Sequence, residues 1–296
     1  NNAFFAEGRY WVNNHAHVLD ATDKNLLDFI AIVINSMKLD DYITGSAQPK
    51  LSQDNLNKIP IVLPPLAEQQ RIIAEIKKWF TLIDQIEQDK ADLQTTIELT
   101  KSKILDLAIH GKLIPQDPND EPAIELLKRI NPDFTPCDNG HYTQLPEGWA
   151  ICKMKQITSI TNGKSQKNVE TLNGIYPIYG SGGVIGRANQ YLCIAGSTII
   201  GRKGTINNPI FVEEHFWNVD TAFGLKANDA ILDKYLYYFC LSFDFSKLDK
   251  STAMPSLTKT SIGNVLIPIP PYKEQERIVA KIDMVLDTMN EILRAV

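Results

Sequence analysis

The chain repeats part of itself, and this repeat constrains its architecture more than any other feature. Residues 1–90 align without a gap with residues 207–296. The match is densest between residues 64–72 and 270–278, where six of nine positions are identical. Solenoid units are far shorter, at about 20–50 residues. We therefore infer a duplicated domain followed by a helix, present as one complete unit flanked by two incomplete ones.

Composition narrows the class of protein. The 296 residues (33.3 kDa) suffice for two domains, and 44% hydrophobic with 22% charged residues is typical of a globular chain. No apolar run reaches the roughly 20 residues that cross a bilayer, and no signal sequence opens the chain, so we expect a cytoplasmic protein without membrane contact. Four scattered cysteines predict reduced thiols. The net charge of -5 excludes a uniformly basic coat protein, but it allows a local basic surface.

A long helix is predicted over residues 66–110, directly after Pro64-Pro65. Its apolar residues alternate at spacings of four and three, which is the heptad seam of a coiled coil, and Gly111 is a typical helix end. At ~1.5 Å per residue the helix would be roughly 65–70 Å long. Five heptads and a matching second helix, which stops at Val296, favour helix pairing over one amphipathic helix packed on a globular core. The seam residues are Ile72, Ile76, Trp79, Ile83, Ile86, Leu93 and Ile97 in the first helix and Ile278, Ile282, Val285 and Met289 in the second.

The remaining segments predict short strands and helices. In the connector, Pro122 opens a helix over Ala123–Ile130. Four strands and one helix are expected after it: Tyr176–Tyr179, Tyr191–Ile194, Thr198–Ile200, Ile210–Val212 and the helix Ala230–Cys240. The incomplete copy at the start should contain a helix over Leu26–Val33 and a closing strand over Ile59–Leu63. The predicted fold class is α+β, with mixed α/β domains joined by long coiled-coil helices.

No motif predicts catalysis. The glycine-rich stretch 179–186 lacks the G-x-G-x-x-G spacing, and no Walker-type loop is present. The stretch 208–211 is faintly similar to the Asn-Pro-Pro-Phe/Tyr loop of adenine methyltransferases, but its repeat counterpart at 2–5 lacks both prolines. The five histidines show no metal-ligand spacing. We therefore predict no catalytic residue, no metal and no cofactor.

Local charge indicates a different activity. Residues 151–206 contain seven Lys or Arg residues and one acid, Glu170. Two polar, basic loops, 162–167 and 201–205, lie beside glycines, and such loops suit contacts to phosphates and base edges. A solvated surface without a ligand is the alternative. The predicted DNA-binding residues are Lys164, Ser165, Lys167, Tyr179, Ser181, Gly182, Arg187, Arg202, Lys203 and Thr205.

With these features the chain resembles the specificity (S) subunit of type I restriction–modification enzymes. The resemblance covers essentially the whole chain. Its motifs are Pro64-Pro65-Leu66-x-Glu68-Gln69-x-Arg71-Ile72, its repeat Pro270-Pro271-Tyr272-x-Glu274-Gln275-x-Arg277-Ile278, the stretch 111–122 (GKLIPQDPNDEP), Leu145-Pro146-Glu147-Gly148-Trp149, Tyr179-Gly180-Ser181-Gly182-Gly183, Gly201-Arg202-Lys203-Gly204 and Phe216-Trp217-x-x-Asp220-Thr221.

The resemblance implies a non-catalytic reader of double-stranded DNA. In that family two target-recognition domains lie at opposite ends of an antiparallel helix pair, and each reads half of a bipartite site. The helices bind methyltransferase (M) subunits, and restriction (R) subunits join the assembly. The implied division is 1–63 (second half of a first recognition domain), 64–112 (conserved helix), 113–148 (connector), 149–270 (complete second recognition domain) and 271–296 (start of the second conserved helix).

The sequence departs from the family pattern at both ends. The first recognition domain lacks its N-terminal half and the second helix is short, so we expect a truncated subunit. Two alternatives follow. One is an orphan or truncated half-subunit that self-associates as a homodimer through its helices. The other is a coiled-coil scaffold that binds only proteins, against which the local basic segment argues.

Overall fold

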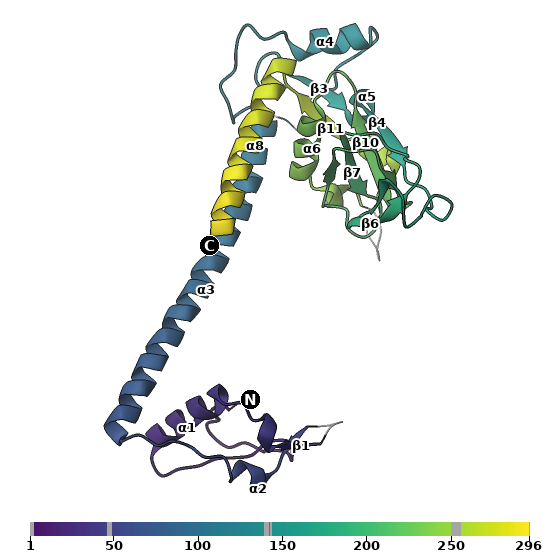
Figure 1. Cartoon of the computed structure of the whole chain (residues 1–296). Coiled ribbons are helices and arrows are strands. Elements are labelled where there is room, and N and C mark those ends of the chain that lie inside the picture. The colour runs from purple at the N-terminus through teal and green to yellow at the C-terminus, as the bar shows by residue number, and fades with distance from the viewer. Residues whose placement is uncertain (1–2, 46–48, 139–141, 143, 250–255, 296) are drawn as a thin grey trace. The chain divides into compact units, whose positions relative to one another are not determined.

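The structure, a computed structural model, describes residues 3–45, 49–138, 142, 144–249 and 256–295. The chain divides into two compact units, Asn1–Asp92 and Leu93–Val296 (Figure 1). One continuous helix, α3 (Leu66–Ile109), contributes to both units and confirms the long helix expected over 66–110. Helices and sheets occur together in the α+β arrangement that the sequence predicts.

The first unit is small and mainly helical. Besides the start of α3 it contains α1 (Lys24–Ser36), η1 (Asp40–Tyr42), β1 (Ile43–Thr44), β2 (Lys50–Leu51) and α2 (Gln53–Leu56). Strands β1 and β2 pair antiparallel. A modest core forms around Ile34, Leu39 and Ile59. Helix α3 is joined to α1 by an ion pair of 2.5 Å between Lys77 and Asp28.

The second unit holds most of the β-structure. Its elements are α4 (Ala123–Ile130), β3 (Ala150–Lys153), α5 (Met154–Ile157), β4 (Thr158–Asn162), β5 (Tyr176–Gly180), β6 (Gly183–Ala188), β7 (Ser197–Gly201), β8 (Ile210–Val212), β9 (Trp217–Asn218), β10 (Ala222–Ala227), α6 (Asp233–Ser242), η2 (Phe245–Leu248), α7 (Lys259–Gly263), β11 (Leu266–Ile269) and α8 (Tyr272–Ala295). A four-stranded antiparallel sheet has the order β4-β10-β7-β8. A second sheet, β6-β5-β9, and a two-stranded sheet, β11-β3, lie beside it.

The largest core of this unit is built from the four-stranded sheet and the helices. Strand β7 (STIIG) is buried along its whole length, as a short β-branched run between turns predicts. Phe223 and Leu225 of β10 pack in the same cluster as Phe239 of α6 and Ile278 of α8. The loops at the ends of β4, β7 and β10 are therefore held by strands that are fixed in the core.

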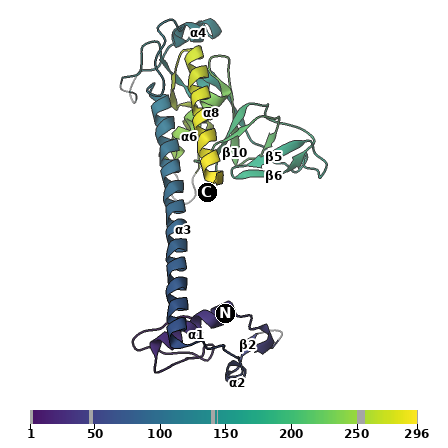
Figure 2. The same cartoon turned by 60° about the vertical axis from the view of Figure 1, so that its left-hand side comes forward.

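Helix α8 runs antiparallel to the part of α3 that follows Leu93 (Figures 1 and 2). Ile282 of α8 and Leu105 and Ala108 of α3 are buried in one cluster. Helix α3 ends in a Schellman motif: Gly111 has a φ of 66° and donates to Ala108 O, while the next amide donates to Leu107 O. Gly111 thus ends the helix where the sequence places its C-terminus.

The sequence repeat is also visible as repeated structure. Helices α1, α2 and α3 occupy the same repeat positions as α6, α7 and α8, and η1 occupies that of η2. Even the caps are shared, because Ser52 and Thr258 each accept a hydrogen bond from the amide three residues on. The two copies differ in burial, however: Trp217 is 8% exposed whereas its counterpart Trp11 is 95% exposed.

Two element predictions are wrong. Residues 59–63 form no strand, whereas the equivalent β11 pairs with β3. Residues 191–194 form only a single bridge, in which Leu192 and Cys193 donate to Phe216 O. The helix expected over Ala230–Cys240 is confirmed with shifted bounds, because α6 begins at Asp233 and Leu232 N before it donates to the Gln275 side chain. The helices Ala123–Ile130 and Leu26–Val33 are confirmed, although the latter extends to Lys24–Ser36.

Candidate nucleic-acid interface

The two basic loops that the sequence singles out, 162–167 and 201–205, are both hydrogen-bonded to one short segment, Trp217–Ala222. It comprises β9 and the turn that leads into β10. Lys164 N donates to Asn218 O at 3.0 Å, and the indole of Trp217 donates back to Lys164 O at 2.9 Å. Arg202 N donates to Thr221 O at 2.7 Å. Loops that are far apart in the sequence are therefore tied to one stretch of backbone.

Glycines allow this close approach. A Cβ atom on Gly163 would lie 1.8 Å from Val219 O, and one on Gly201 would lie 1.8 Å from Thr205 O. The same position on Gly201 is 3.2 Å from the Cβ of Ser181, which places the turn of the β5–β6 hairpin against the 201–205 loop. A side chain at either glycine would push the loops apart.

The cations in these loops differ in how they are held. The Arg202 guanidinium donates to Asp220 O at 3.4 Å and lies 5.9 Å from the centre of the Phe223 ring, so its direction is constrained. Lys164 and Lys203 are exposed. In the described part of the chain, no acidic side chain lies within 4.0 Å of the charged groups of these three residues. Their charge therefore remains available to an external anion.

The backbone of the 201–205 loop is fixed on its other side as well. Leu257 N donates to Arg202 O at 2.9 Å, and Lys203 forms a bridge with Ser256. A charged loop held at both edges loses little conformational entropy when it binds, which favours precise contacts.

The structure brings only part of the predicted site together. Lys164, Arg202 and Lys203 are hydrogen-bonded to the Trp217–Ala222 segment through their backbone amides, and Ser181, which precedes Gly182, and Thr205 lie against Gly201. Ser165 and Lys167 are exposed in the stretch that follows Lys164. Arg187 pairs with Pro177 in the β5–β6 hairpin, and its side chain donates to Ile175 O.

Tyr179 points into the fold. Its ring packs edge-on against Phe216 with centroids 5.5 Å apart. Burial, and then the charge of Glu214, raises the pKa of its hydroxyl, while Arg187 lowers it. Its carbonyl accepts a hydrogen bond from Val219 N at 2.9 Å, so Tyr179 links β5 to the Trp217–Ala222 segment.

Sequence reasoning missed three exposed residues at this surface: Val184, Ile185 and Asp220. The two apolar residues follow a glycine pair in a β-branched run, a pattern that normally indicates a buried strand. Asp220 lies within the Phe216–Thr221 motif, but nothing in the sequence shows that its side chain would be exposed.

The helix seam is buried only in part. Ile97, Ile278 and Ile282 are buried, and Ile72, Ile76, Leu93, Val285 and Met289 are half-buried. Trp79, Ile83 and Ile86 are exposed, together with Phe80 and Leu82. Near the start of α3 the buried apolar residue is Ile73 and not Ile72, so the buried apolar position there is one residue away from the predicted seam.

The repeated Glu-Gln-x-Arg motif on α8 holds the connector and the core together. Gln275 accepts from Leu232 N and donates to Ala230 O and Pro270 O. Glu274 accepts from the Trp149 indole at 3.1 Å. Burial raises the pKa of Glu274 to about 6, although the Trp149 hydrogen bond and Arg277 lower it. This motif is therefore structural in the second unit.

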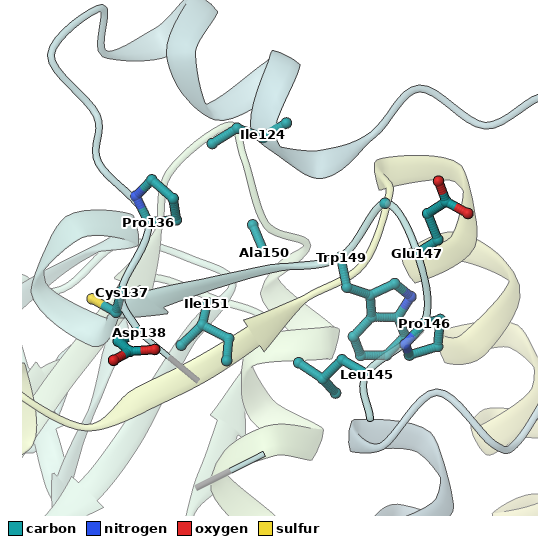
Figure 3. A pocket seen from close by; sticks show the side chains of 11 residues that line it. Ile124, Pro136, Cys137, Asp138, Leu145, Pro146, Glu147, Trp149, Ala150 and Ile151 are labelled. Carbon is teal, nitrogen blue, oxygen red and sulfur yellow. The ribbon is translucent and has the colours of Figure 1, made fainter. Parts of the chain in front are cut away.

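A cavity of about 440 Å³ lies next to this junction. Figure 3 shows Trp149, Leu145 and Pro146 on one side of it, and Cys137 and Asp138 on the other. Among the residues that the structure describes, no group of three His, Cys, Asp or Glu side chains is placed to hold a metal ion. No helix in the described ranges is long and apolar enough to span a membrane.

Comparison with known proteins identifies the class. The family model for the type I restriction modification DNA specificity domain matches residues 2–95 and 146–296, and the chain belongs to this family. The two matched stretches contain the two copies of the repeat.

Individual relatives agree with this assignment. The chain is 25% identical over 340 residues to the type I restriction enzyme EcoAI specificity subunit of Escherichia coli, covering 84% of this chain and 57% of that subunit. It is 25% identical over 305 residues to the putative type I restriction enzyme specificity subunit S.HindORF215P of Haemophilus influenzae, covering 97% and 71%.

Solved structures show the same fold. The HsdS subunit from Thermoanaerobacter tengcongensis aligns with a TM-score of 0.57 at 19% identity, covering 91% of this chain and 64% of that one. A chain from a study of complex assembly in the type I R-M system aligns with a TM-score of 0.65 at 21% identity, covering 92% and 64%. The chain thus spans less than two thirds of the length of both structures and of the Escherichia coli relative.

Proposed function

We propose that this chain is a DNA-reading specificity subunit of a type I restriction–modification system and has no catalytic centre of its own. The observation that carries the proposal is the set of basic loops tied to Trp217–Ala222, whose cations have no acidic partner in the described part of the chain. Such an arrangement suits a phosphate backbone and the base edges beside it. Membership of a DNA specificity domain family supports the same reading.

In this proposal the recognition domain, residues 149–270, binds one half-site of double-stranded DNA. Lys164, Arg202 and Lys203 form the centre of the contact, with Ser181, Gly182 and Thr205 around them. Lys167, Ser165 and Arg187 would contact DNA from the flank. Tyr179 would act mainly by positioning β5, because its ring is packed on Phe216.

The remaining segments would hold partners. We assign residues 64–112 and 271–296 to the helices that bind M subunits, residues 113–148 to the connector, and residues 1–63 to the second half of the first recognition domain. R subunits would join the same assembly and supply nuclease activity, as M subunits supply methyl transfer. Support for a protein-binding role of α3 comes from its exposed apolar side chains, Trp79, Phe80, Leu82, Ile83 and Ile86.

The proposal is tested in two steps with the full chain, alone and with an M subunit. Binding to a microarray of all short duplex sequences identifies a preferred sequence. Affinity for that preferred duplex is then measured at several salt concentrations. A triple variant, Lys164→Ala, Arg202→Ala and Lys203→Ala, removes the central cations. The matched control is Lys155→Ala, Lys259→Ala and Lys281→Ala, which removes the same charge from exposed positions on α5, α7 and α8.

We expect the central variant to lose most of its affinity and its salt dependence, because each phosphate contact contributes to the slope of binding against salt. The control should bind like the wild type. Equal binding by the central variant and the wild type, with both folded, would refute the assigned surface. Absence of any preferred sequence on the array would refute the specificity function.

Self-association is a second candidate function, and one observation favours it. The exposed apolar stripe on α3, from Trp79 to Ile86, suits a second helix, which a second copy of the chain would supply through a homodimer. Measurement of the molar mass in solution, with and without an M subunit, separates the two arrangements. A monomer that binds the M subunit favours the subunit role, whereas a dimer that ignores it favours self-association.

A further inference from the structure

The turn of the β5–β6 hairpin has an irregular register that directs an apolar side chain outward. Tyr179 pairs with Val184, but Ile178 pairs with Gly186, so Ile185 is an extra residue in β6. A bulge of this kind bends the strand and re-aims the side chain at the irregularity. The two residues that follow the turn therefore do not both pack into the sheet.

Both side chains are exposed although they are apolar. Val184 is 58% exposed and Ile185 is 55% exposed. Two carbons of Ile185 lie 3.6 and 3.8 Å from the position that a Cβ on Gly180 would take, so its side chain rests on the hairpin backbone. The tip thus presents a small apolar surface on a well-supported strand pair.

The turn of the hairpin contains a glycine, Gly182, that the fold itself does not require. A Cβ on Gly182 would meet no atom within 4 Å, and Gly182 is not among the residues with positive φ. Neither crowding nor backbone conformation within the chain therefore requires glycine here. A glycine at such a position permits close approach by another molecule.

The surroundings of the tip indicate what that molecule is. Ser181 lies against Gly201, which immediately precedes Arg202 and Lys203, so the apolar tip adjoins the basic loops. A ligand that is anionic overall and apolar at one point fits this combination. The major groove of DNA has these properties, because it admits a two-stranded β-ribbon and displays the C5-methyl group of thymine between the phosphate backbones.

We propose that the tip of the β5–β6 hairpin enters the major groove and that Val184 and Ile185 read thymine through its C5-methyl group. This inference rests on the proposed DNA-reading function and extends it to the kind of base that is recognised. Val184 and Ile185 contribute shape and apolar contact, while Arg202 and Lys203 hold the backbone or the neighbouring bases.

The test removes only the methyl group. The duplex that the full chain, with its M subunit where binding requires it, prefers in a random thymine-containing pool is resynthesised with deoxyuridine in place of thymine. Wild type should bind the uracil duplex about fourfold more weakly for each methyl lost from the contact, which corresponds to about 0.8 kcal/mol per buried CH₂ group. The double variant Val184→Ser and Ile185→Ser should bind both duplexes equally.

The control variant is Leu172→Ser with Ile175→Ser, which removes two exposed apolar residues from the loop before β5. It should keep the preference for thymine. Thermal unfolding checks that each variant is folded, and Val184→Ala and Ile185→Ala alone replace the double variant if it is not; each should lose part of the preference.

The outcomes separate the two proposals. A wild-type protein that binds a preferred sequence with equal affinity for thymine and uracil overturns methyl reading but leaves specific DNA binding intact. Variants that weaken both duplexes by the same factor also overturn it, since the tip would then act as a wedge or as a general contact. A protein that shows no preferred sequence in the pool fails at the level of the proposed function itself.

Discussion

Arg277 on α8 forms a two-point ion pair with Asp120 of the connector. Its two terminal nitrogens lie 3.3 and 2.5 Å from the two carboxylate oxygens of Asp120. The Asp120 side chain is buried, whereas Arg277 is partly exposed. Residues 157 positions apart in the sequence are thereby joined, and the pair links the connector to the start of the helix.

The pair should stabilise the second unit. We expect Arg277→Ala to lower the free energy of unfolding by about 1–3 kcal/mol, because it leaves a buried carboxylate without its charged donor. Arg277→Lys should recover only part of this, since Lys cannot make the forked contact. The measurement is urea denaturation followed by circular dichroism.

The repeat provides the control for this experiment. Arg71 has the same motif position on α3 and is exposed, so Arg71→Ala should change stability by less than about 0.5 kcal/mol. Equal effects of the two substitutions would show that the ion pair contributes little beyond helix propensity.

Glu274 predicts a dependence of stability on pH. Burial raises the pKa of its carboxyl from 4.5 in the unfolded chain to about 6 in the folded one. The folded state therefore binds more protons between these values, and Glu274 should make stability fall as pH rises from about 4.5 to about 6 and stay level above that. We expect a change on the order of 1 kcal/mol.

The comparison is again between the two copies of the motif. Glu274→Gln should flatten the dependence over this pH range, while Glu68→Gln, at the exposed counterpart on α3, should leave it as in the wild type. Denaturation midpoints at half-unit pH steps give the answer. A slope that survives in Glu274→Gln would assign the titration to another group.

Of two residues in the predicted helix seam, Ile282 should stabilise the fold, whereas Ile83 should stabilise association with a partner. Ile282 is buried and Ile83 is exposed. Ile282→Asp places an unpaired charge in the core and should destabilise the fold by more than about 4 kcal/mol. Ile83→Asp should change the stability of the isolated chain by less than about 0.5 kcal/mol, but it should abolish association through α3 with an M subunit or a second copy.

Gel filtration with mass determination, together with thermal unfolding, separates these effects. The exposed Gln94, on the same helix, is the control position for Asp substitution. Intact association of Ile83→Asp would show that the apolar stripe of α3 is not a docking surface.

The sequence predicts the helices well because their signals are local. The heptads before Gly111 and the proline before Ala123 each depend on neighbouring residues alone. Strands depend on a partner. The stretch 59–63 has a strand-forming composition but forms no strand, whereas its counterpart β11 pairs with β3.

The candidate site also depends on contacts between distant residues, which the local sequence does not reveal. Composition indicates two basic loops, but their convergence depends on hydrogen bonds to Asn218 O and Thr221 O, which no local pattern reveals. Tyr179 lies in a suitable motif, yet its ring turns inward because Phe216 packs against it. Exposure of Ile185 results from a bulge that depends on the pairing of two strands.

In the proposed interface, Arg202 and Lys203 are neighbours that should have different roles in DNA binding. The guanidinium of Arg202 is directed by Asp220 O and the Phe223 ring, so it suits a base edge, while the exposed Lys203 suits a phosphate. Arg202→Ala should weaken the preferred duplex by about 1–3 kcal/mol and leave unrelated duplexes nearly unchanged. Lys203→Ala should weaken all duplexes similarly and reduce the salt slope by about one. Fluorescence anisotropy on a preferred and a scrambled duplex, at several salt concentrations, measures both quantities, with Lys155→Ala as the control. Uniform weakening by Arg202→Ala would reassign it to phosphate binding, and wild-type affinity at every salt concentration would remove it from the interface.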